Sequence, residues 1–90
     1  MAHRIGVIHA TPHSLAPIGE AFAALWPEAE PVNLLDETLL ADRRVAGELT
    51  PALHDRVAAL ARHSVKSGAR CVLYSCSAFG AAIEGAKRQV

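Results

Sequence analysis

The sequence predicts an α/β protein with a parallel sheet covered by helices on both faces. Three short apolar segments, at residues 4–9, 31–35 and 71–74, alternate with longer segments whose apolar residues recur at helical spacing. The short segments are too apolar for strands with one face in water, and strands buried on both faces are typical of parallel sheets. Right-handed crossovers then favour a flavodoxin-like order, in which the first strand lies between the second and the third.

The first strand and helix lie within residues 4–27. Residues 4–9 form a buried strand rich in Ile and Val, and residues 11–13 form the loop after it. Ser14 is a candidate N-cap for a helix that Pro27 ends. The apolar positions of this helix follow helical spacing: Leu15, Ile18, Phe22 and Leu25.

The middle of the chain is predicted to hold a strand, a charged connection and a long helix. The strand covers residues 31–35, and the connection, residues 36–48, includes a helical turn. Thr50 and Pro51 are a favourable N-cap and first residue for the long helix, and Gly68 follows its end.

The last unit joins a strand at residues 71–74 to a helix at residues 79–90, with Cys76 between them. A helix N-terminus has unpaired N–H groups and a partial positive charge, so it favours an anion. Cys76 is therefore a candidate thiolate, acting as a nucleophile or as a proton-transfer base. The alternative is a buried structural cysteine.

The surroundings of Cys76 favour a small anion as ligand. In a flavodoxin-like sheet, ligands bind outside the carboxyl ends of the first and third strands, where the strand order reverses. Hydroxyl groups and the first amides of the last helix would supply hydrogen-bond donors there. The predicted substrate-binding residues are His9, Thr11, Ser75, Ser77, Ala78 and Phe79.

Composition limits the partners of the chain. The 90 residues suffice for one small domain, and nine basic residues balance nine acidic ones. A neutral chain with 4% aromatic residues is not expected to bind nucleic acid. We expect no membrane partner and a cytoplasmic location, because the apolar runs are short and the first residues do not form a signal peptide.

Three segments, RIGVIHATP, NLLDETLL and YSCSAFGAAIE, resemble the aspartate/glutamate racemase superfamily, which includes hydantoin racemases, maleate isomerases and arylmalonate decarboxylases. The resemblance implies a cofactor-independent enzyme with two similar α/β domains and one cysteine from each at the site. Cys76 matches the first-domain cysteine. Ser77 matches the residue after it in the family's pattern of Cys, then Asn or Ser, then Thr or Ser. Thr11 matches the loop that helps to hold the substrate carboxylate. Ala78 departs from the Thr or Ser that is usual there.

By this resemblance, residues 1–90 correspond to the N-terminal portion of such a protein, an incomplete half with three strands. The family continues through a fourth strand and a second domain that carries the other cysteine. The open edge of the third strand is then expected to favour association with a second copy of the chain.

Other polar residues have competing roles. His9 is either a catalytic acid or base or a residue that makes local hydrogen bonds. A metal site formed by His9 and His13 is less favoured than either of these roles. Asp36 and Glu37 follow a strand and are either acid–base groups or solvated loop residues. Cys71 is expected in the core. The spacing of the two cysteines matches neither a redox pair nor a zinc site, so we predict no metal.

Two functions fit these observations. In the first, the Cys76 thiolate removes the proton α to the carboxylate of an amino acid or a related acid, as a racemase or isomerase. Such a reaction needs a second base on the opposite face, whereas the sequence offers one suitable cysteine. In the alternative, the chain is a catalytically incomplete module that binds a carboxylate or associates with itself.

Overall fold

The computed structural model describes residues 3–75 of the chain. Its elements in chain order are β1 (His3–His9), a short 3₁₀ helix (Pro12–Ser14), α1 (Leu15–Leu25), β2 (Ala29–Leu35), α2 (Thr38–Ala46), α3 (Pro51–Lys66) and β3 (Cys71–Tyr74).

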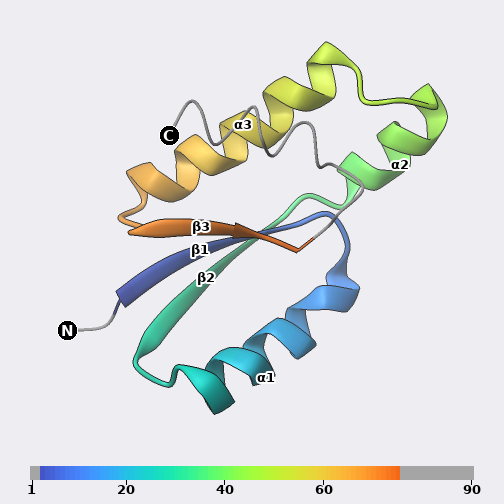
Figure 1. Cartoon of the computed structure of the whole chain (residues 1–90). Coiled ribbons are helices and arrows are strands. Elements are labelled where there is room, and N and C mark those ends of the chain that lie inside the picture. Colours follow the sequence, from blue (N-terminus) through green and yellow to red (C-terminus); the bar gives the residue numbers. More distant parts are fainter. Residues whose placement is uncertain (1–2, 76–90) are drawn as a thin grey trace.

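The three strands form an open parallel sheet in the order β2-β1-β3, so the α/β class and the flavodoxin-like order are confirmed. β1 pairs with β2 along its whole length and with β3 through residues 5–8. Figure 1 shows α1 on one face of the sheet and α2 and α3 on the other. Because the strands are parallel, their carboxyl ends meet at one edge of the sheet.

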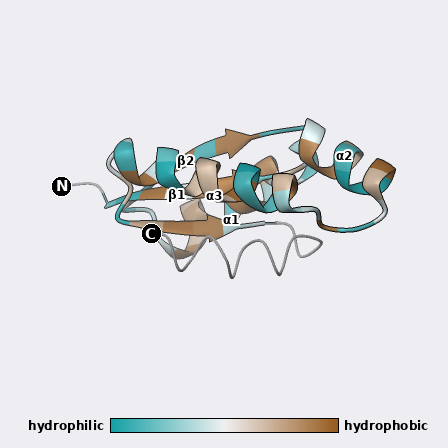
Figure 2. Ribbon diagram, turned by 90° about the horizontal axis from the view of Figure 1, so that it is seen from above, coloured by the Kyte–Doolittle hydropathy of each residue, from teal (hydrophilic) through white to brown (hydrophobic). Residues whose placement is uncertain are grey.

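The main core lies between the sheet and the α2–α3 side. Its buried members are Ile8, Ala10, Leu39, Leu53, Val57, Ala58 and Ala61. On the opposite face of β1, Ile5 and Val7 are also buried. Figure 2 shows strands that are largely hydrophobic and helices in which hydrophilic and hydrophobic residues alternate. This pattern is the one expected when helices cover a parallel sheet.

Gly6 brings α3 close to the centre of the sheet. A Cβ atom at this position would lie 2.7 Å from both Cβ and Oγ of Ser64. No ordinary contact is that short, so only glycine allows α3 to pack at this distance from β1. Ser64 is itself buried, and its Oγ has no hydrogen-bond partner among the described residues.

The predicted ends of the long helix are confirmed. The Oγ1 of Thr50 accepts a hydrogen bond from the Leu53 amide at 3.3 Å, and Pro51 is the first helical residue. Gly68 follows the helix with a φ of 95°, a left-handed conformation that glycine adopts without strain. Gly47 ends α2 in the same way, with a φ of 78°.

The charged connection contains more helix than the sequence indicated. A single helical turn was expected, whereas α2 has nine residues. Asp36, which precedes the helix, accepts a hydrogen bond from the Thr38 amide at 3.0 Å. Arg43 and Arg44 lie in the last turn, where the helix dipole favours cations. Only Leu39 of this helix is buried, so its apolar pattern in the sequence is weak.

The expectation that Cys71 lies in the core is wrong, because this cysteine is exposed. β3 is an edge strand of the sheet formed by the described residues, and Cys71 lies on its α1 side, in the same row as Leu73. Leu73 is 45% exposed, so the α1 side of β3 is only partly covered.

The helix predicted at residues 79–90 lies outside the described residues. Among the helices of residues 3–75, none combines the length and the apolar character needed to cross a membrane.

Candidate functional site

A cluster of polar side chains lies at the carboxyl edge of the sheet, around His9. This histidine ends β1 and is completely buried. Its Nδ1 lies 2.6 Å from Ser14 Oγ and 3.0 Å from Ser75 Oγ. Its Nε2 lies 2.7 Å from Asn33 Oδ1. The cluster therefore joins β1, β2, the start of α1 and the end of β3.

Strand alternation explains why these residues meet. The β1–β2 register pairs Asn33 with Val7, which shares a face of the sheet with His9. Ser75 extends the β1–β3 ladder, because its amide donates to the carbonyl of Ile8 at 3.0 Å. All of these side chains lie on the face that α1 covers. Residues far apart in the sequence thus converge because parallel strands end together.

The hydrogen bonds fix the orientation of the His9 ring. Asn33 Oδ1 can only accept, so Nε2 of His9 donates to it. The hydroxyl nearer to Nδ1 is that of Ser14. The Ser75 hydroxyl can donate to Ser14 Oγ at 3.0 Å or to the carbonyl of Ile8 at 3.3 Å. The result is a continuous hydrogen-bond network that joins Ser75, Ser14, His9 and Asn33.

Ser14 stands at the N-cap position of α1, as the sequence predicted, but its side chain makes no capping hydrogen bond. The hydroxyl turns toward His9 and lies 3.4 Å from the carbonyl of Thr11. The ordinary capping role of serine is thus replaced by a contact with the buried histidine. This contact was not anticipated from the sequence.

Thr11 lies beside the cluster, in the loop after β1, and is half-buried. It lines a hollow of about 250 Å³ between this loop and α2. The wall of the hollow includes two side chains that can be cationic, His13 and Arg44, together with the carboxylate of Glu37. A hollow of this size, at the carboxyl edge of a parallel sheet, is large enough for a small organic acid.

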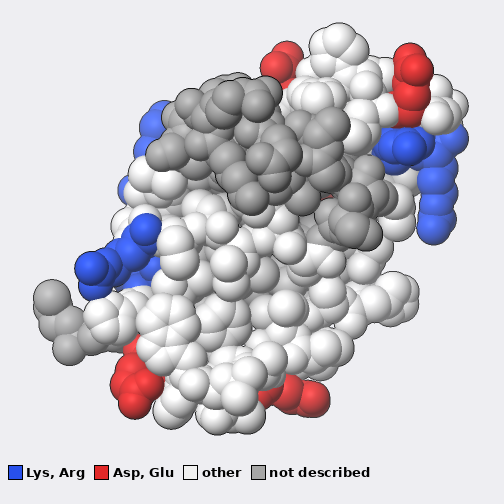
Figure 3. Space-filling view, viewed as in Figure 1, with Lys and Arg blue, Asp and Glu red and all other residues white. Residues whose placement is uncertain are grey.

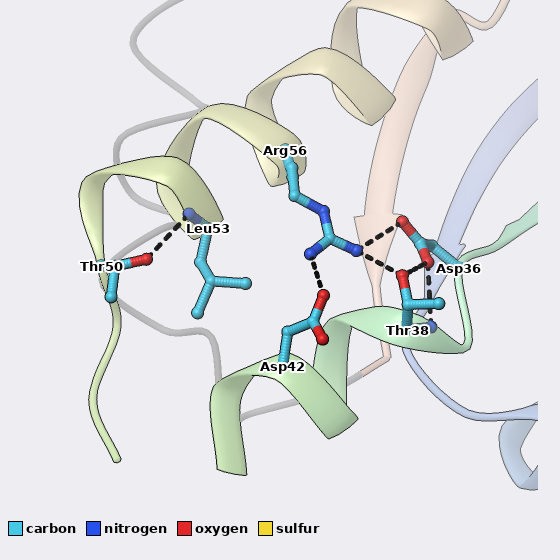
Figure 4. A network of polar contacts seen from close by, with 6 residues as sticks. All are labelled: Asp36, Thr38, Asp42, Thr50, Leu53 and Arg56. Atoms are coloured by element: carbon cyan, nitrogen blue, oxygen red, sulfur yellow. Dashed lines mark hydrogen bonds and ion pairs between the residues drawn. The ribbon is translucent and has the colours of Figure 1, made fainter. Parts of the chain in front are cut away.

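Asp36 belongs to a separate network, which Figure 4 shows. Its Oδ1 accepts from the amide and the hydroxyl of Thr38, and its Oδ2 pairs with Arg56 at 3.1 Å. Arg56 also pairs with Asp42 of α2 at 2.6 Å, so α3 is joined both to α2 and to the loop that precedes α2. These contacts occupy both oxygens of Asp36, which argues against the acid–base role considered for it.

The pKa of Asp36 reflects these contacts. Burial raises the pKa, but hydrogen bonds from Thr38 and Arg56 and the charge of Arg56 lower it further, so it lies below its ordinary value of 3.8. The carboxylates raise the pKa of Arg56 in turn. Asp36 is thus held as a carboxylate by its partners and has a structural role.

Four of the predicted site residues, Cys76, Ser77, Ala78 and Phe79, lie outside the described residues. The other three, His9, Thr11 and Ser75, are close together at the carboxyl edge of the sheet. Within residues 3–75, no group of three or more His, Cys, Asp or Glu side chains is arranged to hold a metal ion.

Comparisons of the chain with protein-family models, with curated proteins and with solved structures gave no significant match. The resemblance to the racemase superfamily therefore stays a prediction based on the three sequence segments.

Proposed function

We propose that the chain is a cofactor-independent racemase or isomerase domain for a small carboxylate, with the Cys76 thiolate as the base that removes the α-proton. The observation that carries this proposal is the contact of Ser75 with His9 and Ser14. It fixes the residue before Cys76 at the edge where parallel α/β sheets bind their ligands.

The chemistry has two requirements. A base must approach the α-carbon, and the negative charge that develops must be stabilised by donors in fixed positions. Cys76 is the proposed base. Thr11, Ser75 and the amides of Ser77, Ala78 and Phe79 are the proposed donors to the carboxylate, with the hollow beside Thr11 as space for the rest of the acid.

The test is exchange of the α-hydrogen in deuterium oxide, with aspartate and glutamate as substrates, each supplied as separate L and D enantiomers. Replacing Cys76 with alanine is expected to reduce the rate of α-hydrogen exchange by at least about 100-fold for at least one enantiomer, because proton transfer by a positioned group contributes ~10²–10⁴-fold. The matched control is Cys71→Ala. Cys71 is exposed at the opposite end of β3 and should not affect exchange.

A second outcome would favour the alternative function, a carboxylate-binding module. In that case, amide chemical shifts of Thr11 and Ser75 would change when aspartate or malonate is added, while no α-hydrogen exchanges. Exchange that survives in Cys76→Ala for both enantiomers would contradict the role of this thiolate.

A further inference from the structure

A small cavity lies between α3 and the sheet, on the face opposite the His9 cluster, and its volume is about 50 Å³. Gly6 of β1 and Ser64 of α3, both buried, form its inner end. At its outer end the wall consists of exposed residues, namely Arg4, His63 and Ser67. Roughly 10–15 Å³ is enough to hold one water molecule, so this cavity has room for one or more.

The Ser64 hydroxyl faces the inner end of the cavity. Its Oγ lies 2.7 Å from the place that a Cβ atom of Gly6 would take, so the group is directed at the centre of the sheet. Ser64 is 4% exposed, and its Oγ has no hydrogen-bond partner among the described residues. Buried hydroxyl groups in folded proteins almost always have a partner, because leaving one without a hydrogen bond is costly. This hydroxyl therefore points to a ligand in the cavity that can donate or accept a hydrogen bond.

The wall of the cavity contains further hydrogen-bonding groups. Besides Ser64 it includes the side chains of Arg4, His63 and Ser67. Arg4 is held in place there, because its Nη1 donates to the Ser67 carbonyl at 2.7 Å. Buried water makes about three hydrogen bonds to polar groups that otherwise lack a partner, whereas cavities that stay free of water are apolar. The polar wall thus favours water over an apolar ligand.

Packing and backbone contacts hold Ser64 at the cavity. Its Cβ lies 2.7 Å from the place of a Gly6 Cβ, so α3 already lies against the backbone of β1. The Ser64 carbonyl accepts from the amides of Ser67 at 3.2 Å and Ala69 at 3.0 Å, which fixes the turn after α3. The hydroxyl is therefore kept in its position by contacts on both sides.

Water also fits this site better than an ion does. Ser64 supplies the hydroxyl at the inner end, and Val32 and Leu34 of β2 add apolar side walls. A metal ion needs several oxygen ligands, and an anion needs several donors. The described residues at the inner end do not offer such a set.

We propose that this cavity is a binding site for internal water, in which at least one water molecule hydrogen-bonds the Ser64 hydroxyl and links it to the polar groups at the outer end. The inference is independent of the proposed function, because none of the cavity residues belongs to the proposed carboxylate site. Its consequence is that Ser64 stabilises the contact between α3 and β1 through bound water, at the point where Gly6 brings the two elements together.

Nuclear magnetic resonance tests for the water directly. Water held in the cavity should give nuclear Overhauser cross-peaks with the α-hydrogens of Gly6. The control is Val32→Ile. Val32 pairs with Gly6 in the β1–β2 register, so the added methyl group takes up space in the cavity while Ser64 keeps its hydroxyl. Cross-peaks from bound water should be lost in this variant, whereas cross-peaks that arise from exchange of the Ser64 hydroxyl itself should remain.

Stability gives a second test, in which a cavity with water and one without it predict opposite signs. Ser64→Ala should raise the equilibrium constant for unfolding by about 2- to 10-fold, because a hydrogen bond to water is lost, although alanine has the higher helix propensity. Val32→Ile should raise this constant as well, because it displaces the water that Ser64 needs. In the Ser64→Ala background, Val32→Ile should instead lower the constant, because the methyl group then fills an apolar space. Urea unfolding measures all four proteins.

Three results would overturn the proposal. The first is a wild-type protein without the cross-peaks at Gly6, and the second is cross-peaks that remain in folded Val32→Ile. The third is a Ser64→Ala variant at least as stable as the wild type, which would show that the hydroxyl had no partner to lose. None of these results bears on the exchange of the α-hydrogen, so the proposed function is tested separately.

Discussion

The two faces of the sheet are covered to very different degrees. α3 contributes five buried residues to its face, Leu53, Val57, Ala58, Ala61 and Ser64, whereas α1 contributes none. Leu25, at the end of α1, is 85% exposed, while Leu53 on α3 is 3% exposed. The difference indicates that α3 buries far more of its own side chains than α1 does, although Ile5 and Val7 of β1 are buried on the α1 face. The α1 side combines the polar cluster around His9 with exposed apolar surface.

The strongest test of this comparison is a matched pair of leucine substitutions. Leu53→Ala should lower the free energy of unfolding by about 2–5 kcal/mol, because it removes a buried side chain and leaves a cavity. Leu25→Ala should change it by less than about 0.5 kcal/mol, because this side chain is already in water. Urea unfolding followed by circular dichroism measures both. Equal losses would show that α1 packs as tightly as α3.

Two glycines provide the next test. Gly6→Ala should destabilise the protein by about 1–3 kcal/mol, because its Cβ would lie 2.7 Å from Ser64. Gly19 lies inside α1 with nothing within 4 Å of an added Cβ, so Gly19→Ala should stabilise the helix by about 0.5–1 kcal/mol.

A double-mutant cycle isolates the Gly6 contact. In a Ser64→Gly background, the cost of Gly6→Ala should shrink, since the atoms that clash are gone. A cost that stays the same in both backgrounds would indicate that the loss comes from the strand itself rather than from the approach of α3.

The difference between the faces also explains what the sequence could predict. Thr50, Pro51 and Gly68 are local signals, and the ends of α3 followed from them. α2 was underestimated because only Leu39 of its side chains is buried. The polar cluster depends on contacts across as many as 66 residues, between His9 and Ser75, and no local pattern encodes them.

One signal for the cluster was nevertheless present. Asn33 is the single amide in β2 and is flanked by Val32 and Leu34, and a polar residue there suggests a hydrogen-bond partner on the same face of a neighbouring strand. His9 and Ser75 were predicted from their places at strand ends. The role of Ser14 could not be read, because a serine before a helix ordinarily caps it.

The exposed apolar surface on the α1 side leads to a prediction about association. Six residues line a hollow between α1 and β3: Ile18, Ala21, Phe22, Leu25, Trp26 and Leu73. On the face seen in Figure 3, charged side chains lie toward the rim, and an uncharged area extends over part of α1 and β3. β3 is also an edge strand of the described sheet. We therefore expect a second copy of the chain to bind at this hollow.

Leu25→Glu tests this expectation. It should weaken self-association by about tenfold or more, since it would bury a charge among apolar side chains, and sedimentation at several concentrations measures the change. Val45→Glu is the control, because Val45 is 89% exposed on α2, away from the hollow. If both variants associate like the wild type, or if the wild type stays monomeric, the hollow is not an interface between copies.

The smallest expected effect concerns the Arg56 network, which ties α3 to the turn after β2. Arg56→Met should lower the free energy of unfolding by about 0.3–1 kcal/mol near pH 7, because partly exposed ion pairs contribute little. The folded-state pKa of Asp36 lies below 3.8, so its ion pair stabilises the protein above the unfolded-state value and is lost as pH falls through the folded-state pKa. The stability difference between wild type and variant should therefore shrink in acid. Arg44→Met, which removes an exposed cation from α2, is the control and should show no such dependence on pH. If the loss of unfolding free energy in Arg56→Met is the same at every pH, the loss comes from packing of the side-chain stem and not from the ion pair.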